Sequence, residues 1–218
     1  MRDLRPCSAA PSAGDAQTVT TALVIYASLR GSTASIANWI ADELRVHGVD
    51  AWPVPAAHVT NVDSVDAVVI GSAVYFGRWM LDASDLLHRH VAELRTKPVW
   101  LYCSGPVTEP SASLHLAHQD RLAELVGARG SRVFGGSLDR PTAGPVDSVL
   151  GPFRPGDWRD EHAVRRWARE IAAVLSAVPA PPLSARAGTA SHAVKAWLGA
   201  VTAVCSVAAP LLGILLAG

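Results

Sequence analysis

The feature of this sequence that most constrains its fold is a series of short, uninterrupted apolar runs that alternate with helical patterns. The first run is Ala22-Leu23-Val24-Ile25-Tyr26, and the apolar residues of the following segment, about 33–47, recur with helical spacing. A strand without polar alternation is buried on both faces, which is typical of a parallel sheet covered by helices. The pattern therefore indicates an α/β fold.

The same alternation continues to about residue 178. Further strands are predicted at 49–54, 66–71, 98–103 and 132–138, and further helices at about 80–94, 113–128 and 157–178. Gly48 is expected to end the first helix, and Asp157 is expected to cap the last one. Because crossovers between parallel strands are right-handed, helices should cover both faces of the sheet. We predict a doubly wound, five-stranded parallel sheet over residues 21–178.

Composition limits the classes of partner. Half of the 218 residues are hydrophobic and 17% are charged, which is ample for a core. The 19 basic and 19 acidic residues balance, and no basic cluster indicates nucleic-acid binding. The cysteines are three in number, widely spaced and without a CxxC pair, so neither a disulfide framework nor a zinc site is expected. The histidines likewise have no convincing metal-binding spacing.

Three loops rich in small and hydroxyl residues follow predicted strands, at residues 28–33, 72–77 and 104–106. The carboxyl ends of parallel strands share one edge, and open α/β sheets bind ligands there. In the first loop, Gly31 permits close backbone approach, and Ser28, Ser32 and Thr33 offer hydroxyl donors beside a helix N-terminus. Taken alone, this loop fits phosphate binding and an ordinary capped helix equally well. It is neither a Walker loop nor a GxGxxG fingerprint.

The first loop resembles the phosphate loop of flavodoxins, whose pattern is Ser/Thr-x-Thr-Gly-x-Thr. The chain matches at Ser28, Gly31 and Thr33, and it carries Arg30 where the family usually has Thr. The run Gly-Ser-Ala-Val-Tyr-x-Gly-x-Trp at 71–79 resembles a second flavin loop. More narrowly, it is similar to flavodoxin-domain proteins related to menaquinone-dependent protoporphyrinogen IX dehydrogenase, and Gly-Asp-Trp-Arg-Asp at 156–160 fits that branch as well.

The resemblance implies FMN as a non-covalently bound cofactor, with its phosphate on the first loop. It assigns the site to Ser28, Leu29, Arg30, Gly31, Ser32, Thr33, Ser72, Ala73, Val74, Tyr75, Phe76, Gly77, Ser104, Gly105 and Pro106. Tyr75 is the best candidate to stack on the isoalloxazine ring, the alternative being that Tyr75 and Phe76 only pack the loop. Arg30 either pairs with the phosphate or is solvated. No catalytic acid or base and no metal ligand can be named.

The composition changes after residue 178. A Pro- and Ala-rich linker is expected at 179–192, and a hydrophobic tail, expected to form a C-terminal helix, at 193–218. Residues 196–217 are uncharged and mostly apolar, and as a helix they would span roughly 33 Å, enough to cross a bilayer core. We expect a membrane anchor, the alternatives being a helix lying on the membrane and a dimerising or core-packing helix. Lys195 and Arg186 then place the flavin domain on the cytoplasmic face of the cell membrane.

Residues 1–20 lack the apolar core of a secretory signal and are expected to be a disordered leader.

Two functions fit these observations. The first is an FMN-dependent oxidoreductase that oxidises a small molecule, which the resemblance identifies as protoporphyrinogen IX, and reduces menaquinone in haem biosynthesis. The second is a membrane-tethered electron-transfer or partner-binding module without small-substrate turnover. Soluble flavodoxin carriers are typically strongly acidic, so the neutral charge of this chain favours the first. The oligomeric state cannot be predicted from the sequence.

Overall fold

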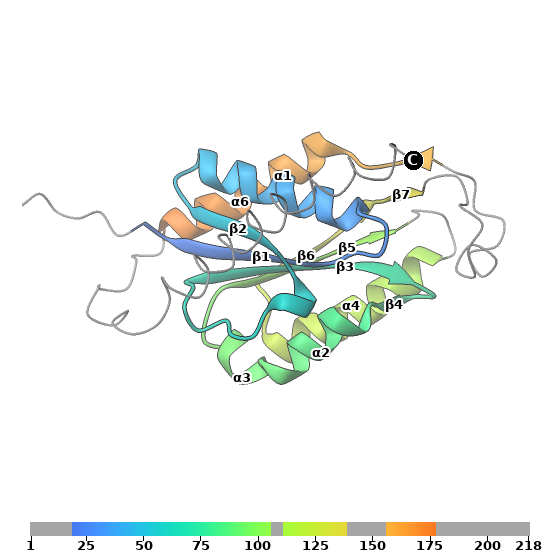
Figure 1. Cartoon of the computed structure of the whole chain (residues 1–218), viewed down its shortest axis with the longest axis horizontal. Helices are drawn as coiled ribbons and strands as arrows, with labels where there is room; N and C mark the ends of the chain where they lie inside the picture. The colour runs from blue at the N-terminus through green and yellow to red at the C-terminus, as the bar shows by residue number, and fades with distance from the viewer. Residues whose placement is uncertain (1–18, 106–110, 139–155, 178–218) are drawn as a thin grey trace, which may run out of the picture.

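The computed structural model describes residues 19–105, 111–138 and 156–177 of the chain. Within these ranges, a twisted sheet lies between two layers of helices (Figure 1). All but the last two residues of the expected leader, and the whole of the expected linker and hydrophobic tail, lie outside the described residues. No helix among the described residues is long and apolar enough to cross a membrane.

The sheet has the strand order β2-β1-β3-β5-β6, and these five strands of the described region run parallel. The strands are β1 (Thr21–Ala27), β2 (Asp50–Pro55), β3 (Ala67–Tyr75), β5 (Val99–Gly105) and β6 (Gly130–Gly135). The order reverses beside β1, because the chain passes from β2 at one edge to β3 on the other side of β1. The prediction of a doubly wound, five-stranded parallel sheet is therefore confirmed, and the reversal marks the edge at which ligands of such folds bind.

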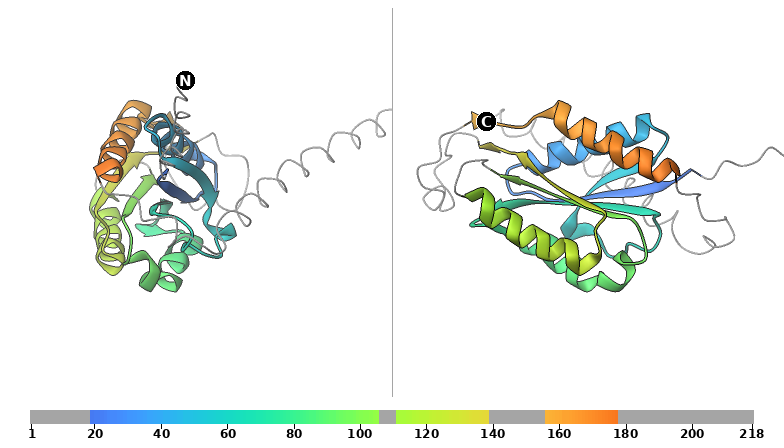
Figure 2. Two further views of the ribbon diagram at one scale, coloured as in Figure 1. Left: turned by 90° about the vertical axis from the view of Figure 1, so that its left-hand side faces the viewer. Right: turned by 180° about the vertical axis from the view of Figure 1, so that it is seen from behind.

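The helices form one layer on each face of the sheet. The first layer contains α1 (Ser32–Val46) and α6 (Glu161–Ala177). The opposite layer contains α2 (Leu81–Arg89), α3 (Val91–Leu94) and α4 (Ser111–Val126), and a short 3-10 helix, η1 (Ala56–His58), follows β2. The view from behind in Figure 2 shows the same two layers on either side of the strands.

A separate hydrophobic core lies on each face of the sheet. This explains why polar and apolar residues do not alternate along the strands. In β1, Val24 points into the core under α1 and α6, whereas Ile25 points into the core over α2 and α4. Both side chains are fully buried. Burial of an aliphatic side chain of this size stabilises the fold by about 1.5–3 kcal/mol.

A close contact joins β3 to β5 near the carboxyl edge. The Tyr102 side chain is fully buried, and a Cβ atom at Gly71 would lie 1.9 Å from its Cζ atom. The ring also lies 6.2 Å, centroid to centroid, from both Phe134 and Trp167. Only glycine at position 71 leaves room for this ring.

Three boundaries differ from the sequence predictions. The third strand does not end at Gly71 but continues to Tyr75, and β4 (Arg78–Trp79) then folds back against it as a hairpin. The helix expected over 80–94 is broken at His90 into α2 and α3. The strand expected over 132–138 ends at Gly135, and β7 (Ser137–Leu138) instead pairs with β8 (Gly156–Asp157).

The N-cap predicted for the last helix is also wrong. The helix begins at Glu161, and the Asp160 carboxylate accepts a hydrogen bond of 3.0 Å from the Ala163 backbone N–H. Asp157 lies in β8 instead, where Arg159 binds its carboxylate. Two aspartates stand near the start of the helix, and only the second is spaced to cap its first turn. In contrast, Gly48 ends α1 with a φ of +80°, as expected.

Candidate functional site

Three segments meet at the carboxyl edge of the sheet: the loop after β1, the end of β3 with its hairpin, and the end of β5. Thr33 at the start of α1 and Ser104 at the end of β5 are both buried, and their hydroxyl oxygens are 2.8 Å apart. The Tyr102 hydroxyl additionally donates a hydrogen bond of 3.4 Å to the Thr33 carbonyl oxygen. These contacts join the first and third predicted loops, although Thr33 and Ser104 lie far apart in the sequence.

The start of α1 has the properties of an anion site. Gly31 occupies the N-cap position with a φ of +83°, a left-handed conformation that side chains disfavour. No side chain of the described residues caps the helix, and its first turn contains no acidic residue. The first N–H groups of a helix lack intrahelical partners and lie at the positive end of its dipole. An anion at this point would satisfy them.

Ser28 provides a direct test of whether a phosphate fits here. Its Oγ atom is buried and has no hydrogen-bond partner within the part of the chain that the structure describes. A buried hydroxyl without a partner costs about 1–3 kcal/mol, so such groups usually indicate an absent ligand or water. A phosphate oxygen would supply the acceptor. The residues present therefore fit a phosphate-bearing ligand.

The two residues between Ser28 and Gly31 differ in their surroundings. The Leu29 side chain is 53% exposed. Arg30 is half-buried, and its positive charge acts on the phenol of Tyr75. Burial raises the pKa of Tyr75, and the neighbouring Arg30 guanidinium opposes that rise. The arginine that replaces the usual family threonine thus lies close enough to the hairpin to affect it electrostatically.

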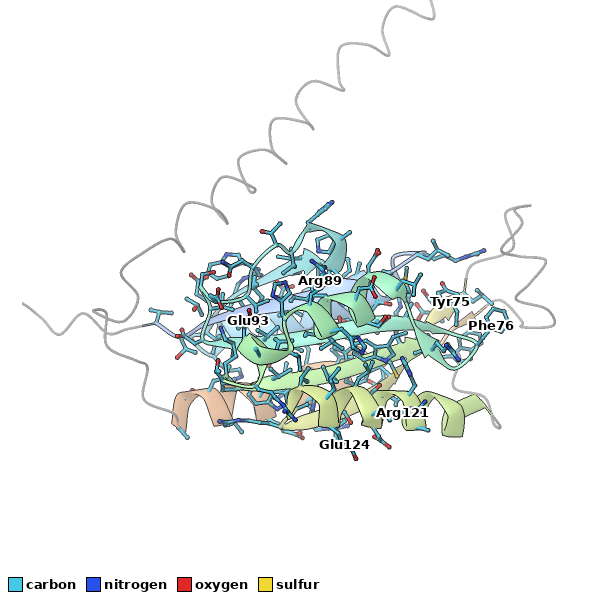
Figure 3. The ribbon with its side chains drawn as sticks, turned by 90° about the horizontal axis from the view of Figure 1, so that it is seen from below. Tyr75, Phe76, Arg89, Glu93, Arg121 and Glu124 are labelled. Carbon is cyan, nitrogen blue, oxygen red and sulfur yellow. The ribbon has the colours of Figure 1, made fainter. Side chains whose placement is uncertain are left out.

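The hairpin presents two aromatic residues at the edge of the sheet. Tyr75 and Arg78 pair across it, so Phe76 and Gly77 form its two-residue turn, with φ values of +51° and +73°. Positive φ at both positions is the type I′ arrangement, which favours Asn-Gly and is costly for a large side chain. The Phe76 side chain is 75% exposed. Figure 3 shows Tyr75 and Phe76 together at one end of the molecule.

The residues before the hairpin tip are structural elements of the strand, and the expectation of a loop over 72–75 is wrong. The Ser72 hydroxyl donates to the Ala73 carbonyl oxygen at 2.8 Å and accepts from the Met80 N–H at 2.9 Å. Val74 is buried in the core over α2 and α4. These contacts fix the base of the hairpin, while contact of Ser72, Ala73 or Val74 with FMN stays a prediction.

The β7–β8 ribbon is the part of the site that sequence reasoning missed. The Ser137 N–H donates a hydrogen bond of 2.8 Å to the Ser32 hydroxyl oxygen. The ribbon is fastened to β5, since the Trp158 N–H donates to the Gly136 carbonyl at 2.9 Å and the Gly136 N–H donates to the Gly105 carbonyl at 3.0 Å. The Gly135-Gly136 pair was the available signal, because adjacent glycines permit backbone segments to approach closely.

Other polar groups at this edge are already paired or inert. Arg159 binds Asp157, which lowers the pKa of that carboxyl to about 2, and the guanidinium lies 5.5 Å from the Trp39 ring centroid. Burial raises the pKa of the Cys103 thiol to about 12, so it stays protonated near neutral pH. Among the described residues, no cluster of His, Cys, Asp and Glu could hold a metal ion. Pro106, predicted to belong to the third loop, lies outside the described residues.

Comparison with known proteins agrees with this geometry. A family model described as a flavodoxin domain matches residues 23–149, more than half of the chain. Comparison of the sequence with curated proteins found no match. The chain resembles the solved structure of an archaeal flavodoxin at 17% identity and a TM-score of 0.51, covering 72% of this chain and 99% of that one.

Two oxidoreductases are also among the similar solved structures. One is an oxidoreductase from Corynebacterium diphtheriae, at 14% identity and a TM-score of 0.54, covering 73% of this chain and 98% of that one. The other is rubredoxin oxygen:oxidoreductase from Desulfovibrio gigas, at 15% identity and a TM-score of 0.53, covering 74% of this chain and 37% of that one. At these identities the similarity establishes the fold.

The fold and the edge site define a flavin-binding redox protein of the doubly wound α/β class. The chain belongs to the flavodoxin domain family. Family membership implies FMN as the cofactor, in agreement with the fit of Ser28 and the start of α1 to a phosphate.

Proposed function

We propose that this chain is an FMN-dependent oxidoreductase that binds its flavin at the carboxyl edge of the sheet. One observation carries the proposal, which is the convergence of three features at this edge. They are the start of α1 and the Ser28 hydroxyl, which have no side-chain cap and no partner among the described residues, and the Tyr75 hairpin. The first two features suit a phosphate, and the third suits an aromatic ring. FMN contains both groups at the two ends of one molecule.

Bound FMN would supply the redox chemistry, and the protein would bind and orient it. The backbone of the first loop and the Ser28 hydroxyl would hold the phosphate. Tyr75 and Phe76 would cover the ring and exclude water from it. The Arg30 guanidinium, close to Tyr75, would stabilise negative charge in this region.

The proposed substrate is a reduced small molecule. The resemblance of residues 71–79 and 156–160 to the protoporphyrinogen dehydrogenase branch supports protoporphyrinogen IX as the electron donor and menaquinone as the acceptor. The neutral net charge of the chain also supports turnover over the charge-steered docking of a diffusing carrier. Residues 193–218 would hold the flavin domain at the cytoplasmic face of the cell membrane, near a lipid-soluble quinone.

The decisive experiment is purification of the full-length chain, identification of the released cofactor, and assay of menaquinone-dependent protoporphyrinogen oxidation. A flavin absorbance band, released FMN and turnover are expected. FMN binding without quinone reduction in any donor panel would replace the proposal with a tethered electron-transfer or partner-binding module. A colourless preparation that FMN cannot reconstitute would refute both.

Localisation has a separate test. The full-length chain should sediment with membranes and resist extraction by high salt, whereas a chain ending at residue 178 should stay in the supernatant. Equal partition of the two chains would remove the membrane anchor from the proposal.

A further inference from the structure

The β7–β8 ribbon holds one residue of the phosphate loop in a defined hydrogen-bonding role. Ser32 is buried, and its hydroxyl oxygen accepts a hydrogen bond of 2.8 Å from the Ser137 N–H, 105 residues away in the sequence. A serine hydroxyl has one proton to donate and two lone pairs. The Ser137 N–H occupies one lone pair of the Ser32 hydroxyl oxygen. The Ser32 hydroxyl proton therefore remains available for donation to an anion.

The ribbon is itself immobilised by close backbone contacts. A Cβ atom at Gly135 would lie 1.9 Å from the Trp158 carbonyl oxygen, and one at Gly156 would lie 2.7 Å from the Trp158 ring. A Cβ atom at Gly136 would meet the Gly105 nitrogen at 3.3 Å and Ser32 Oγ at 3.4 Å. The ribbon, the end of β5 and Trp158 are thus packed closely against one another as a support, and Gly136 lies beside the Ser32 side chain.

We infer that this support sets the selectivity of the site for a phosphate-bearing flavin, with Ser137 and Trp158 as positioning residues that act through Ser32. The inference rests on the proposed FMN binding at this edge. The Ser137 N–H orients Ser32 as a donor, and the contacts of Trp158 with the ribbon hold that N–H in place. Loss of this support should weaken binding of FMN but leave binding of riboflavin, which lacks the phosphate, almost unchanged.

Proline at position 137 provides a direct test, because proline lacks the N–H that binds Ser32. The preceding residue is Gly136, which tolerates the restriction that proline imposes on its neighbour. The matched control is Ser137→Ala, which removes the side chain and keeps the N–H. Fluorescence titration of the full-length apoprotein should give an FMN affinity about tenfold lower for Ser137→Pro than for Ser137→Ala, since hydrogen bonds to charged groups are the strong ones. The riboflavin affinities should agree within about twofold.

A double-mutant cycle then tests whether Ser137 acts through Ser32. Ser32→Ala alone should lower FMN affinity, and adding Ser137→Pro to it should change that affinity by less than about twofold, because the shared interaction is already lost. Additive losses would overturn the inference. Equal FMN affinities for Ser137→Pro and Ser137→Ala would overturn it as well, even where the unaltered chain binds FMN tightly. An unaltered chain that binds neither flavin would overturn both the inference and the proposed function.

Amide hydrogen exchange keeps the inference testable if Ser137→Pro fails to fold. The Ser137 amide should be protected in the unaltered apoprotein and should exchange at least about tenfold faster in Ser32→Ala, while amides in the middle of β5 stay protected. Unchanged protection of the Ser137 amide in Ser32→Ala would contradict a hydrogen bond between them. Trp158→Ala should reduce the FMN-to-riboflavin affinity ratio, and Trp158→Phe should restore part of it.

Discussion

Both edges of the central sheet contain polar side chains, but these side chains are hydrogen-bonded to the protein to different extents. At the amino edge, the Asp66 carboxylate accepts hydrogen bonds of 2.7 Å from the Thr21 N–H and 2.8 Å from the Thr21 hydroxyl. The Lys97 ammonium there donates to the Val62 and Val65 carbonyl oxygens at 2.6 and 3.0 Å. At the carboxyl edge, the Ser28 hydroxyl has no partner among the described residues, and α1 starts without a side-chain cap.

This difference separates a structural end of the fold from a ligand-binding end. Polar groups that satisfy one another stabilise the protein and have little left to offer a ligand. Polar groups held in place without partners cost stability until a ligand arrives. Removal of a paired polar group at the amino edge should therefore lower stability without changing FMN affinity. Removal of an unpartnered polar group at the carboxyl edge should weaken FMN binding without destabilising the apoprotein.

The largest expected effect is at the amino edge. Asp66→Ala removes both hydrogen bonds to Thr21 and should lower the free energy of unfolding by about 2–3 kcal/mol, because each bond involves a charged acceptor. Urea denaturation measures the loss, and FMN affinity should stay within about twofold. The control is Asp63→Ala, an exposed carboxylate on the same edge, with an expected loss of no more than about 0.5 kcal/mol. A comparable loss of FMN affinity in Asp66→Ala would break the distinction between the edges.

At the carboxyl edge, Ser28→Ala should weaken FMN binding about tenfold, equivalent to about 1.4 kcal/mol. The free energy of unfolding of the apoprotein should rise by about 1 kcal/mol, because the substitution removes a buried hydroxyl that has no partner within the described structure. Flavin fluorescence titration and urea denaturation measure the two quantities. Ser176→Ala, near the far end of α6, serves as the control and should alter neither. Destabilisation of the apoprotein by Ser28→Ala would mean that this hydroxyl is structural.

A substitution at the hairpin tip should have a smaller effect on the free energy of unfolding than Asp66→Ala, and it should increase that free energy rather than lower it. Phe76→Asn would place the favoured Asn-Gly pair in the turn and should stabilise the apoprotein by about 1 kcal/mol, because a large side chain at positive φ is strained. The same substitution should weaken FMN binding if Phe76 covers the ring. Thermal denaturation checks the first expectation and fluorescence titration the second. Phe76→Leu should give no gain in stability, and a gain equal to that of Phe76→Asn would argue against relief of backbone strain.

The smallest effect concerns Arg30. Its positive charge favours the anionic form of the Tyr75 phenol and so lowers the pKa of that group; removing the charge in Arg30→Ala should raise this pKa further. Ultraviolet titration of the phenolate measures the midpoint, and the difference from a Tyr75→Phe background isolates Tyr75 from the other two tyrosines. Arg78→Ala, which alters the cross-strand partner of Tyr75, is the control and should leave the midpoint in place. A downward shift in Arg30→Ala would show that Arg30 does not act on Tyr75 as a nearby charge.

The order of the strands and helices could be predicted from the sequence because hydrophobic periodicity is a local property. The apolar run in β1 and the helical spacing of Ile36, Ile40 and Leu44 both indicate burial, and all of these residues are buried except Tyr26, which is partly buried. The first loop could be predicted because its glycine and hydroxyl residues lie between a predicted strand and a predicted helix, and Gly31 has a positive φ there.

Features that depend on partners distant in the sequence were missed. The local sequence gives no sign that Ser137 donates to Ser32, or that Thr33 and Ser104 share a hydrogen bond. The continuation of β3 to Tyr75 depends on pairing with β4, and hydroxyl and glycine residues at 71–72 resembled a loop because they are small. Asp157 and Asp160 have the same capping chemistry, and the helix start that selects Asp160 as the cap is visible only in the structure.

The contact between Gly71 and Tyr102 has a consequence for the evolution of this chain. A side chain at position 71 and a large ring at position 102 cannot coexist, because the Cβ atom would overlap the ring. Neither position can therefore drift independently: a homologue that acquires alanine at 71 needs a smaller residue at 102, and that change would in turn remove the hydroxyl that binds the Thr33 carbonyl. Through this one contact, the packing between two strands limits which phosphate loops the descendants of this sequence can adopt.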